Sequence, residues 1–200
     1  LFNQSRRQTT MGKKYCNAIL GEIHQIDSYK NNKLQYLFNT RDSIYLVDRN
    51  GQYVSPFPIK TDKPMSVPLA LFDYDKLKNY RILVPMENQL TMYNQRGNKI
   101  SGWEFIKTNS NIIMTPEHHQ IFDKDYIIIS EESGKIHLLN RKGQTRSELT
   151  EKIHRSNNKL NLIEGTTLQN TKLITTNENG QVIYIYLNGD IDTLDIQNLK

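Results

Sequence analysis

The histidines and carboxylates are the side chains of this chain that could bind a metal or transfer a proton. His118 and His119 directly follow Glu117 and form the one histidine pair. Neighbouring side chains on a strand point to opposite faces, so these two imidazoles cannot readily share one metal ion. We therefore expect one half-buried and one exposed histidine, and no metal site.

Carboxylates occur in three close pairs, which is the arrangement that general acid–base catalysis uses. The pairs are Glu131 and Glu132, Asp73 and Asp75, and Asp190 and Asp192. The first pair precedes Ser133-Gly134 in a predicted loop, and the last follows a predicted turn, where acidic residues favour solvation. The chain contains no calcium loop, P-loop, dinucleotide fingerprint or Gly-x-Ser-x-Gly motif. The sequence thus indicates no catalytic residue, no cofactor and no enzyme.

Four glycines at equal intervals of 46 residues reveal the elements that position these side chains. They are Gly51, Gly97, Gly143 and Gly189. Each closes a run of apolar and β-branched residues, at 44–51, 90–97, 136–143 and 182–189. An Asp or Asn three residues before the glycine predicts a type I turn with the glycine at positive φ, in a hairpin connection. Only the last copy departs, with Tyr186 at that position.

The same offset predicts further strands in each copy. A second strand is predicted at 36–38, 82–84, 128–130 and 174–176. A first strand is predicted at 23–27, 69–73 and 162–166, and a fourth at 52–57, 98–103, 144–149 and 190–194. Four strands in 46 residues, with no helical stretch, match the size of one β-propeller blade.

We therefore predict an all-β fold, a β-propeller of four four-stranded antiparallel blades. A leucine-rich repeat is shorter, a helical solenoid needs a 3.6-residue period, and an unrepeated sandwich would not keep this register. The predicted domains are a leader at 1–21 and the propeller at 22–200. Its blades span about 22–67, 68–113, 114–160 and 161–200.

The four repeats suit either a complete propeller or part of a larger one. An open stack exposes an apolar sheet face at each end, so closure is expected to be the more stable arrangement. Residues Arg6–Met11 fall where the outer strand of a preceding blade would lie. This segment could close the ring by pairing with the last blade.

The net charge of +5 comes mainly from the leader, which holds four basic residues and no acid. The remainder carries 22 basic and 21 acidic residues, an ordinary mixed surface that does not predict nucleic-acid binding. The single Cys16 permits no internal disulfide, and no apolar run approaches the ~20 residues of a membrane span. Composition therefore leaves the compartment open.

The repeat also assigns places to the candidate catalytic residues. The 46-residue offset puts His118 at the apolar position of Ile26 and Phe72, and His119 at the position of two acids. First strands line the channel of a propeller, and they carry three acids: Asp27, Asp73 and Glu117. These acids define the alternative to a binding protein, a propeller that binds or cleaves glycans.

Loops between second and third strands are expected at the same end of the ring as the links between blades. They are polar and short, which suits a protein or glycan surface better than a deep pocket. We predict Arg41 and Glu87 near the middle of a protein-binding surface, with Trp103 at the adjoining blade link. Trp103 is equivalent to Phe57, so it is either a wedge between blades or an anchor for the partner.

The segment from Tyr45 to Pro58, with its echo ending at Ile100-Ser-Gly-Trp103, resembles repeats of bacterial propellers. It is similar to the PQQ-like and FG-GAP/VCBS-like groups and to envelope proteins built from such blades. The resemblance implies the propeller fold, a bacterial origin and a setting in the periplasm or cell envelope. Together with the polar loops, this predicts a non-enzymatic interaction or scaffold module in that setting. The chain lacks the calcium-loop acids and a quinone signature of these groups, so neither cofactor is implied.

Overall fold

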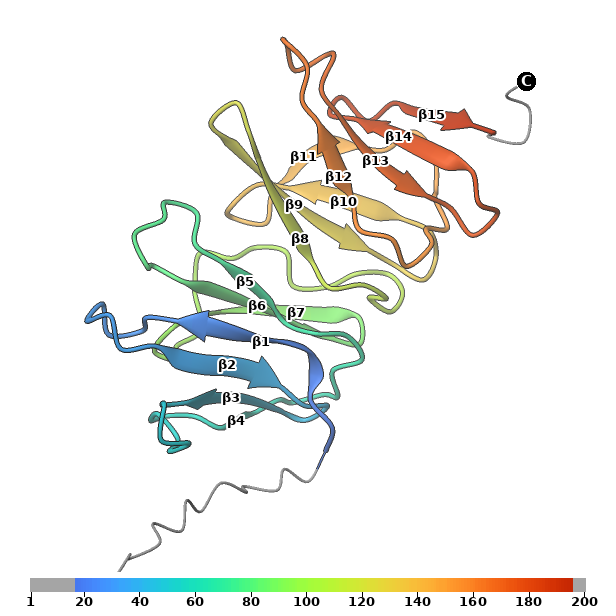
Figure 1. Ribbon diagram of the computed structural model, residues 1–200. Helices are drawn as coiled ribbons and strands as arrows, with labels where there is room; N and C mark the ends of the chain where they lie inside the picture. The colour runs from blue at the N-terminus through green and yellow to red at the C-terminus, as the bar shows by residue number, and fades with distance from the viewer. Residues whose placement is uncertain (1–16, 196–200) are drawn as a thin grey trace, which may run out of the picture.

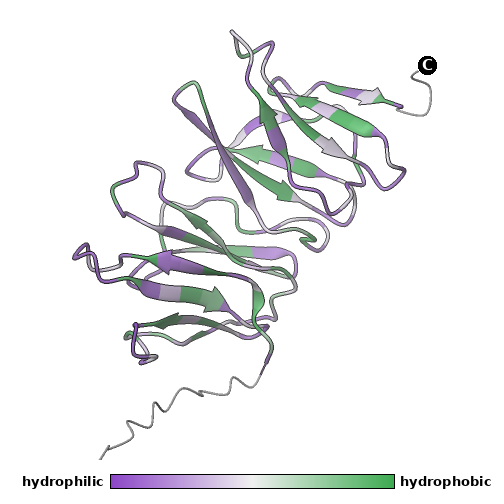
Figure 2. Ribbon diagram, in the orientation of Figure 1, coloured by the Kyte–Doolittle hydropathy of each residue, from purple (hydrophilic) through white to green (hydrophobic). Residues whose placement is uncertain are grey.

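The computed structural model describes residues 17–195, which form four antiparallel β-sheets that follow one another along the chain (Figure 1). No helix occurs within this part of the chain. The sheets are the blades of a β-propeller, which confirms the predicted fold class. Hydrophobic residues gather in inner strands such as β6 (Arg81–Met86), β9 (Lys124–Ser130) and β10 (Ile136–Leu139), whereas the first strands of the first and third sheets are largely hydrophilic (Figure 2).

Each sheet pairs its strands in chain order. The first sheet contains β1 (Leu20–Ile26), β2 (Gln35–Asn39), β3 (Ser43–Val47) and β4 (Ile59–Lys60). The second contains β5 (Ala70–Phe72), β6 (Arg81–Met86) and β7 (Gln89–Asn94). The third contains β8 (Glu117–Ile121), β9 (Lys124–Ser130), β10 (Ile136–Leu139) and β11 (Thr145–Glu148). The fourth contains β12 (Asn161–Ile163), β13 (Lys172–Thr176), β14 (Val182–Tyr186) and β15 (Ile191–Leu194).

The outer strand of the second sheet is reduced to two isolated bridges, Tyr93 with Lys99 and Gln89 with Lys107. A turn interrupts it, in which the Trp103 N–H donates to the carbonyl of Ile100. The first sheet has the same break, because the Phe57 N–H donates to Val54. The predicted fourth strands at 52–57 and 98–103 are therefore each broken by a turn.

The repeated glycines occupy one kind of turn in all four sheets. Their φ angles are positive, from 74° at Gly51 to 103° at Gly189, and each N–H donates to the carbonyl three residues earlier. In the first sheet the Asp48 side chain also accepts the N–H groups of Asn50 and Gln52, each at 2.8 Å. Asn94 and Asn140 do the same in the next two sheets, whereas Tyr186 cannot.

At three of these glycines, the outer segment of the preceding sheet packs against the turn, in the space that a Cβ would occupy. A Cβ added at Gly97 would lie 2.8 Å from Pro56, and one at Gly143 would lie 2.7 Å from the Phe105 nitrogen. A Cβ at Gly189 would overlap the carbonyl oxygen of Glu148, whereas no atom of the described residues lies within 4 Å of one at Gly51. The glycine turn is thus a socket that the preceding blade fills.

The sheets pack face to face through three apolar clusters, one between each successive pair. Ile26, Leu37 and Leu46 of the first sheet meet Ile82 and Val84 of the second. The clusters between the second and third sheets and between the third and fourth are built in the same way. The second and third sheets therefore contribute a face to the core on either side of them, whereas the first and fourth sheets contribute one face each.

The strict 46-residue register is wrong by one residue for the second strands of the third and fourth sheets, β9 and β13, whereas the third strands β10 and β14 keep it. Leu83 lies opposite Met92 in the second sheet, but the residue opposite Leu138 in the third is Ile128 and not Ile129. The connection from β9 to β10 spans residues 131–135, whereas that from β6 to β7 spans two residues, 87 and 88. A shift of one residue exchanges the two faces of a strand.

The four sheets form an open arc, with the first and the last at opposite ends (Figure 1). The described residues therefore do not form the closed four-bladed ring that we expected from stability. The predicted closing segment Arg6–Met11 lies outside the described residues.

The socket contact predicts unequal effects of alanine at two equivalent glycines. Gly51→Ala should destabilise the protein by about 1 kcal/mol, the cost of positive φ for a residue with a Cβ. Gly143→Ala should cost about 2 kcal/mol more, because its Cβ would also overlap the backbone at Phe105. Urea denaturation of both variants measures the difference, and equal losses would contradict the socket.

Candidate functional site

One end of the arc gathers loops from all four sheets. These loops connect the second and third strands of each sheet: β2–β3, β6–β7, β9–β10 and β13–β14. Each forms a backbone hydrogen bond with a link, the segment that connects one sheet to the next. The donor and acceptor pairs are Met65 N to Arg41 O at 2.6 Å, Ile112 N to Glu87 O at 2.8 Å, Ile153 N to Gly134 O at 2.7 Å and Glu178 N to His154 O at 3.0 Å. We call this surface the link end.

The structure brings Arg41 and Glu87 to the link end, where both contact the segment after the first sheet. Arg41 is exposed, and its carbonyl accepts the Met65 N–H. The Glu87 carboxylate lies 3.4 Å from the Lys63 ammonium, with 45% of the Glu87 side chain exposed. The two predicted partner contacts therefore have opposite charges and come from adjacent sheets.

Sequence reasoning missed two exposed isoleucines at the same end. Ile106 is 66% exposed beside the start of β7, where its carbonyl accepts the Leu90 N–H. Ile113 is 40% exposed and follows the Ile112 N–H that binds Glu87. Both lie outside the predicted strands, so a search for apolar residues in predicted loops could have found them.

A pocket of about 330 Å³ also lies at the link end, beside the fourth sheet. Its walls come from the link that precedes β12, from the β13–β14 turn and from the side chains of Ile183 and Thr193. The link contributes Glu151 and His154, and the turn contributes Glu178. The pocket adds a polar depression to the surface that carries Arg41 and Glu87.

The structure does not group Trp103 with Arg41 and Glu87. Trp103 is 7% exposed, within the apolar cluster between the second and third sheets. Its indole N–H donates to the Phe105 carbonyl at 2.6 Å, and its ring lies against the Gly143 turn, away from the link end. These contacts correspond to the wedge between blades.

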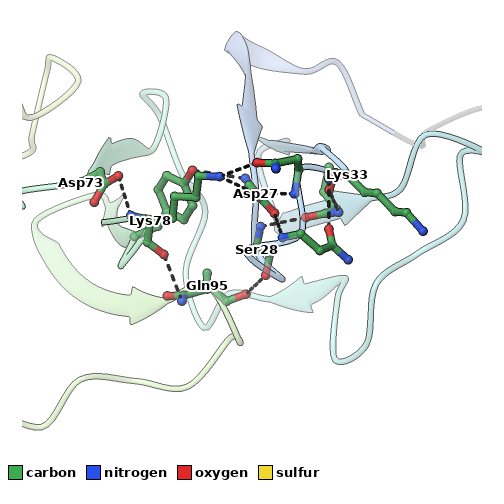
Figure 3. A network of polar contacts seen from close by, with 10 residues as sticks. Asp27, Ser28, Lys33, Asp73, Lys78 and Gln95 are labelled. Carbon is green, nitrogen blue, oxygen red and sulfur yellow. Dashed lines mark hydrogen bonds and ion pairs between the residues drawn. The ribbon is translucent and has the colours of Figure 1, made fainter. Parts of the chain in front are cut away.

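The three acids that we predicted in the first strands lie in β8 (Glu117) or directly after β1 and β5 (Asp27 and Asp73), and all are engaged in hydrogen bonds, beginning with Asp27. Its carboxylate accepts the N–H groups of Asn31 and Asn32, each at 2.9 Å, and the Lys78 ammonium at 2.6 Å (Figure 3). The hydrogen bond from Lys78 holds the pKa of Asp27 below its ordinary value, against the opposing effect of burial. Asp27 therefore stays ionised and fixed.

Asp73 closes the equivalent turn in the second sheet, where its carboxylate accepts the Lys78 N–H at 3.0 Å and the Asn79 N–H at 3.3 Å. Lys78 thus binds Asp73 through its backbone and Asp27 through its side chain (Figure 3). The Gln95 side chain binds the Lys78 carbonyl at 3.5 Å. Both acids serve the junction between the first two sheets.

Glu117 serves the junction between the third and fourth sheets. Its two oxygens accept the Arg155 guanidinium and the Leu160 N–H, each at 2.9 Å. The Arg155 side chain is 1% exposed and also donates to Ser130 at 2.9 Å. Burial lowers the pKa of Arg155, and Glu117 opposes this effect. A buried cation of this kind requires its counter-ion.

The histidines occupy positions opposite to those predicted. Glu117 pairs with Ile128 in the third sheet as Ala70 pairs with Leu83 in the second. Two residues further along the first strand, His119 is therefore equivalent to the apolar Phe72. His118 lies beside it and points to the opposite face of the sheet. Both rings are partly buried, so neither is the exposed histidine that we expected.

The two rings have different environments. His118 contacts the Asp125 carboxylate at 2.7 Å. Burial lowers the pKa of His119, whose Nε2 has no partner among the described residues. Within residues 17–195 no group of three His, Cys, Asp or Glu side chains could hold a metal.

Glu131, which the sequence predicted in a loop before a strand, is buried. It is 1% exposed, and its carboxylate accepts the N–H and the hydroxyl of Ser110, each at 3.0 Å. The His137 Nε2 lies 2.5 Å from its other oxygen. Burial alone would raise the pKa of Glu131, but the bonds from His137 and Ser110 lower it overall. Glu131 therefore ties the link after the second sheet to the third sheet.

A groove of about 680 Å³ runs along the first strands of three sheets, β1, β5 and β8. Asp73 and Glu117 line it, but both are engaged as described, and Asp27 does not line it. His24 also faces the groove, and burial lowers its pKa. The groove corresponds to the predicted channel, without a pair of unengaged acids among the three that we nominated.

No protein-family model matches the chain, and no curated protein matches its sequence. Among the solved structures that share its fold are two of BBS1N in complex with ARL6DN, one soaked with mercury and one with lead. They align with TM-scores of 0.60 at 14% and 13% identity. The alignments cover 89% and 92% of this chain but 54% and 55% of those chains, so this chain spans about half of their length. The described residues contain no helix of the length and hydrophobicity that crossing a membrane requires.

Trp103→Ala separates the wedge from a partner contact. Loss of a large side chain from an apolar cluster should lower the free energy of unfolding by about 3–5 kcal/mol. Ile106→Ala, at an exposed position, should change it by less than about 0.5 kcal/mol. Urea denaturation gives both values, and unchanged stability for Trp103→Ala would instead favour a binding role.

Glu117→Gln tests whether this acid is structural. Removing its charge leaves Arg155 buried without a counter-ion, so we expect a loss of about 3 kcal/mol in the free energy of unfolding. Glu151→Gln, at an exposed position of the link end, is the matched control and should be neutral. A neutral Glu117→Gln would return this acid to the list of catalytic candidates.

Proposed function

We propose that this chain is a non-enzymatic propeller module that binds another protein through its link end. The observation that carries the proposal is the convergence of four loops on that end, each fixed by a backbone hydrogen bond to a link. Such loops present side chains from different sheets. Because the loops are already fixed, they lose little conformational entropy when a partner binds. Arg41 and Glu87 are the proposed contacts.

The engagement of the acids supports a binding module over the alternative, a propeller that cleaves glycans. Glycoside hydrolysis requires two carboxyl groups that are free to act on the substrate. Asp27, Asp73 and Glu117 instead accept backbone N–H groups, and Asp27 and Glu117 also pair with a cation. Protonating or removing them would weaken the junctions between sheets.

The composition of the link end favours a protein partner. Two exposed isoleucines lie near charges of both signs, which is the mixture of apolar centre and polar rim found in protein interfaces. BBS1N, which shares the fold, was solved in complex with ARL6DN. That complex supports the proposal as an example of a protein with this fold bound to another.

The setting that we propose is the bacterial cell envelope. It is supported by the resemblance of the segment at 45–58 to bacterial propeller repeats. In that setting the chain would act as a scaffold or interaction module, with no cofactor.

Site-specific photo-crosslinking in the source cells tests the partner surface. A photoreactive residue at position 41 should capture one protein reproducibly, identified by mass spectrometry. Arg49, in the same sheet but in the turn after β3, is the matched control position and should capture none. Capture at 49 as strong as at 41 would contradict the proposed surface.

Charge reversal then tests Glu87 as a contact. Glu87→Arg should reduce the amount of captured protein several-fold. The substitution replaces the negative charge beside Lys63 with a positive one, which reverses the electrostatic potential that this part of the surface presents to the partner. Arg49→Glu should leave capture unchanged. The melting temperature of both variants should remain that of the parent, which separates lost binding from lost folding.

A further inference from the structure

The outer face of the fourth sheet, on the side away from the third sheet, carries apolar side chains that meet no other sheet among the described residues. Strand pairing places ten residues on this face: Asn161, Ile163, Lys172, Ile174, Thr176, Val182, Tyr184, Tyr186, Asp192 and Leu194. Hydrophobic residues run along β14 in Figure 2. None of the ten is buried, and Ile163 and Leu194 are 39% and 36% exposed.

The equivalent positions of the other three sheets are nearly all covered. Ile163 corresponds to Ile26, which is 0% exposed, to Phe72, which is 4% exposed, and to the half-buried His119. Tyr184 corresponds to Leu46, Met92 and Leu138, which are at most 2% exposed. Ile174 corresponds to Leu37, Leu83 and Ile128, which are at most 1% exposed. In each case the cover is the next sheet.

The repeated contact specifies what would cover the fourth sheet. The inner face of each following sheet presents β-branched and other apolar residues from its second and third strands, such as Ile82 and Val84 in the second. It also presents a glycine turn that receives the outer segment of the sheet before. A complementary cover for β12–β15 is thus another propeller blade, with a glycine at positive φ where β15 ends.

The size of the face decides between a blade on the same polypeptide and a second copy of this chain. Four strands of about five residues span roughly 300 Å² at a spacing of about 4.8 Å and a rise of about 3.3 Å. A stable complex buries about 800 Å² on each partner. One blade face by itself is therefore a small interface for a second copy that must associate freely, whereas a blade on the same polypeptide is tethered and needs no free association.

We propose that a fifth propeller blade, carried by the same polypeptide, packs on the outer face of the fourth sheet. The solved chains that share the fold also extend well beyond their aligned 54% and 55%. The fifth blade would bury Ile174, Tyr184 and Ile163 as the fourth buries Ile128 and Leu138.

Hydroxyl-radical footprinting of the gene product, as its genome encodes it, tests the proposal. Tyr184 and Tyr186 should react several-fold more slowly in that product than in the chain of residues 1–200. The difference should be the same at two protein concentrations, because the cover is intramolecular. Equal reactivity in the two proteins would overturn the proposal, and protection that grows with concentration would overturn it in favour of a second copy.

A pair of lysine substitutions keeps the test independent of the labelling chemistry. Ile174→Lys should lower the urea midpoint of the gene product as much as Ile128→Lys does, since both positions would be covered. In the chain of residues 1–200, Ile174→Lys should be as mild as Ile106→Lys at an exposed site. A mild Ile174→Lys in the gene product would overturn the proposal.

Discussion

The contact between one blade and the next is the interaction on which the rest of the structure depends. A single four-stranded sheet cannot bury both of its faces, so each sheet of this chain obtains its core from its neighbours. The outer segment of one sheet fills the glycine turn of the next, which fixes the position of every following sheet. The link end exists because this same placement aligns four loops, with Arg41 and Glu87 among them.

Charged side chains reinforce these junctions. Lys78 joins the first two sheets through Asp27 and Asp73, and Arg155 joins the last two through Glu117. An acid that accepts backbone N–H groups and a cation is held ionised in one orientation, which suits a junction and does not suit proton transfer. The acids that a catalytic interpretation would select are thus those that the architecture requires, and the exposed loops remain for binding.

Much of this arrangement could be predicted from the 46-residue spacing of the glycines, because each turn needs a glycine at positive φ and this requirement leaves a regular pattern in the sequence. The glycine turns, the all-β class and the placement of Arg41 and Glu87 at one end follow from that pattern. The faces of the third sheet could not be predicted, since Ile127, Ile128 and Ile129 are identical and give the same pattern in either register. Nor could spacing reveal the burial of Glu131 or the reach of Lys78, because both depend on side chains that meet across sheets.

The isoleucine run of β9 has a consequence for how such a chain can diverge. A connection that gains or loses one residue normally turns apolar side chains outward and ruins a blade. Here the inserted length is absorbed, since whichever isoleucine turns to a given side, both neighbouring sheets still meet an isoleucine. A strand made of one apolar residue type therefore allows duplicated blades to change in loop length and keep their packing. This tolerance is one way in which initially identical blades can become different from one another.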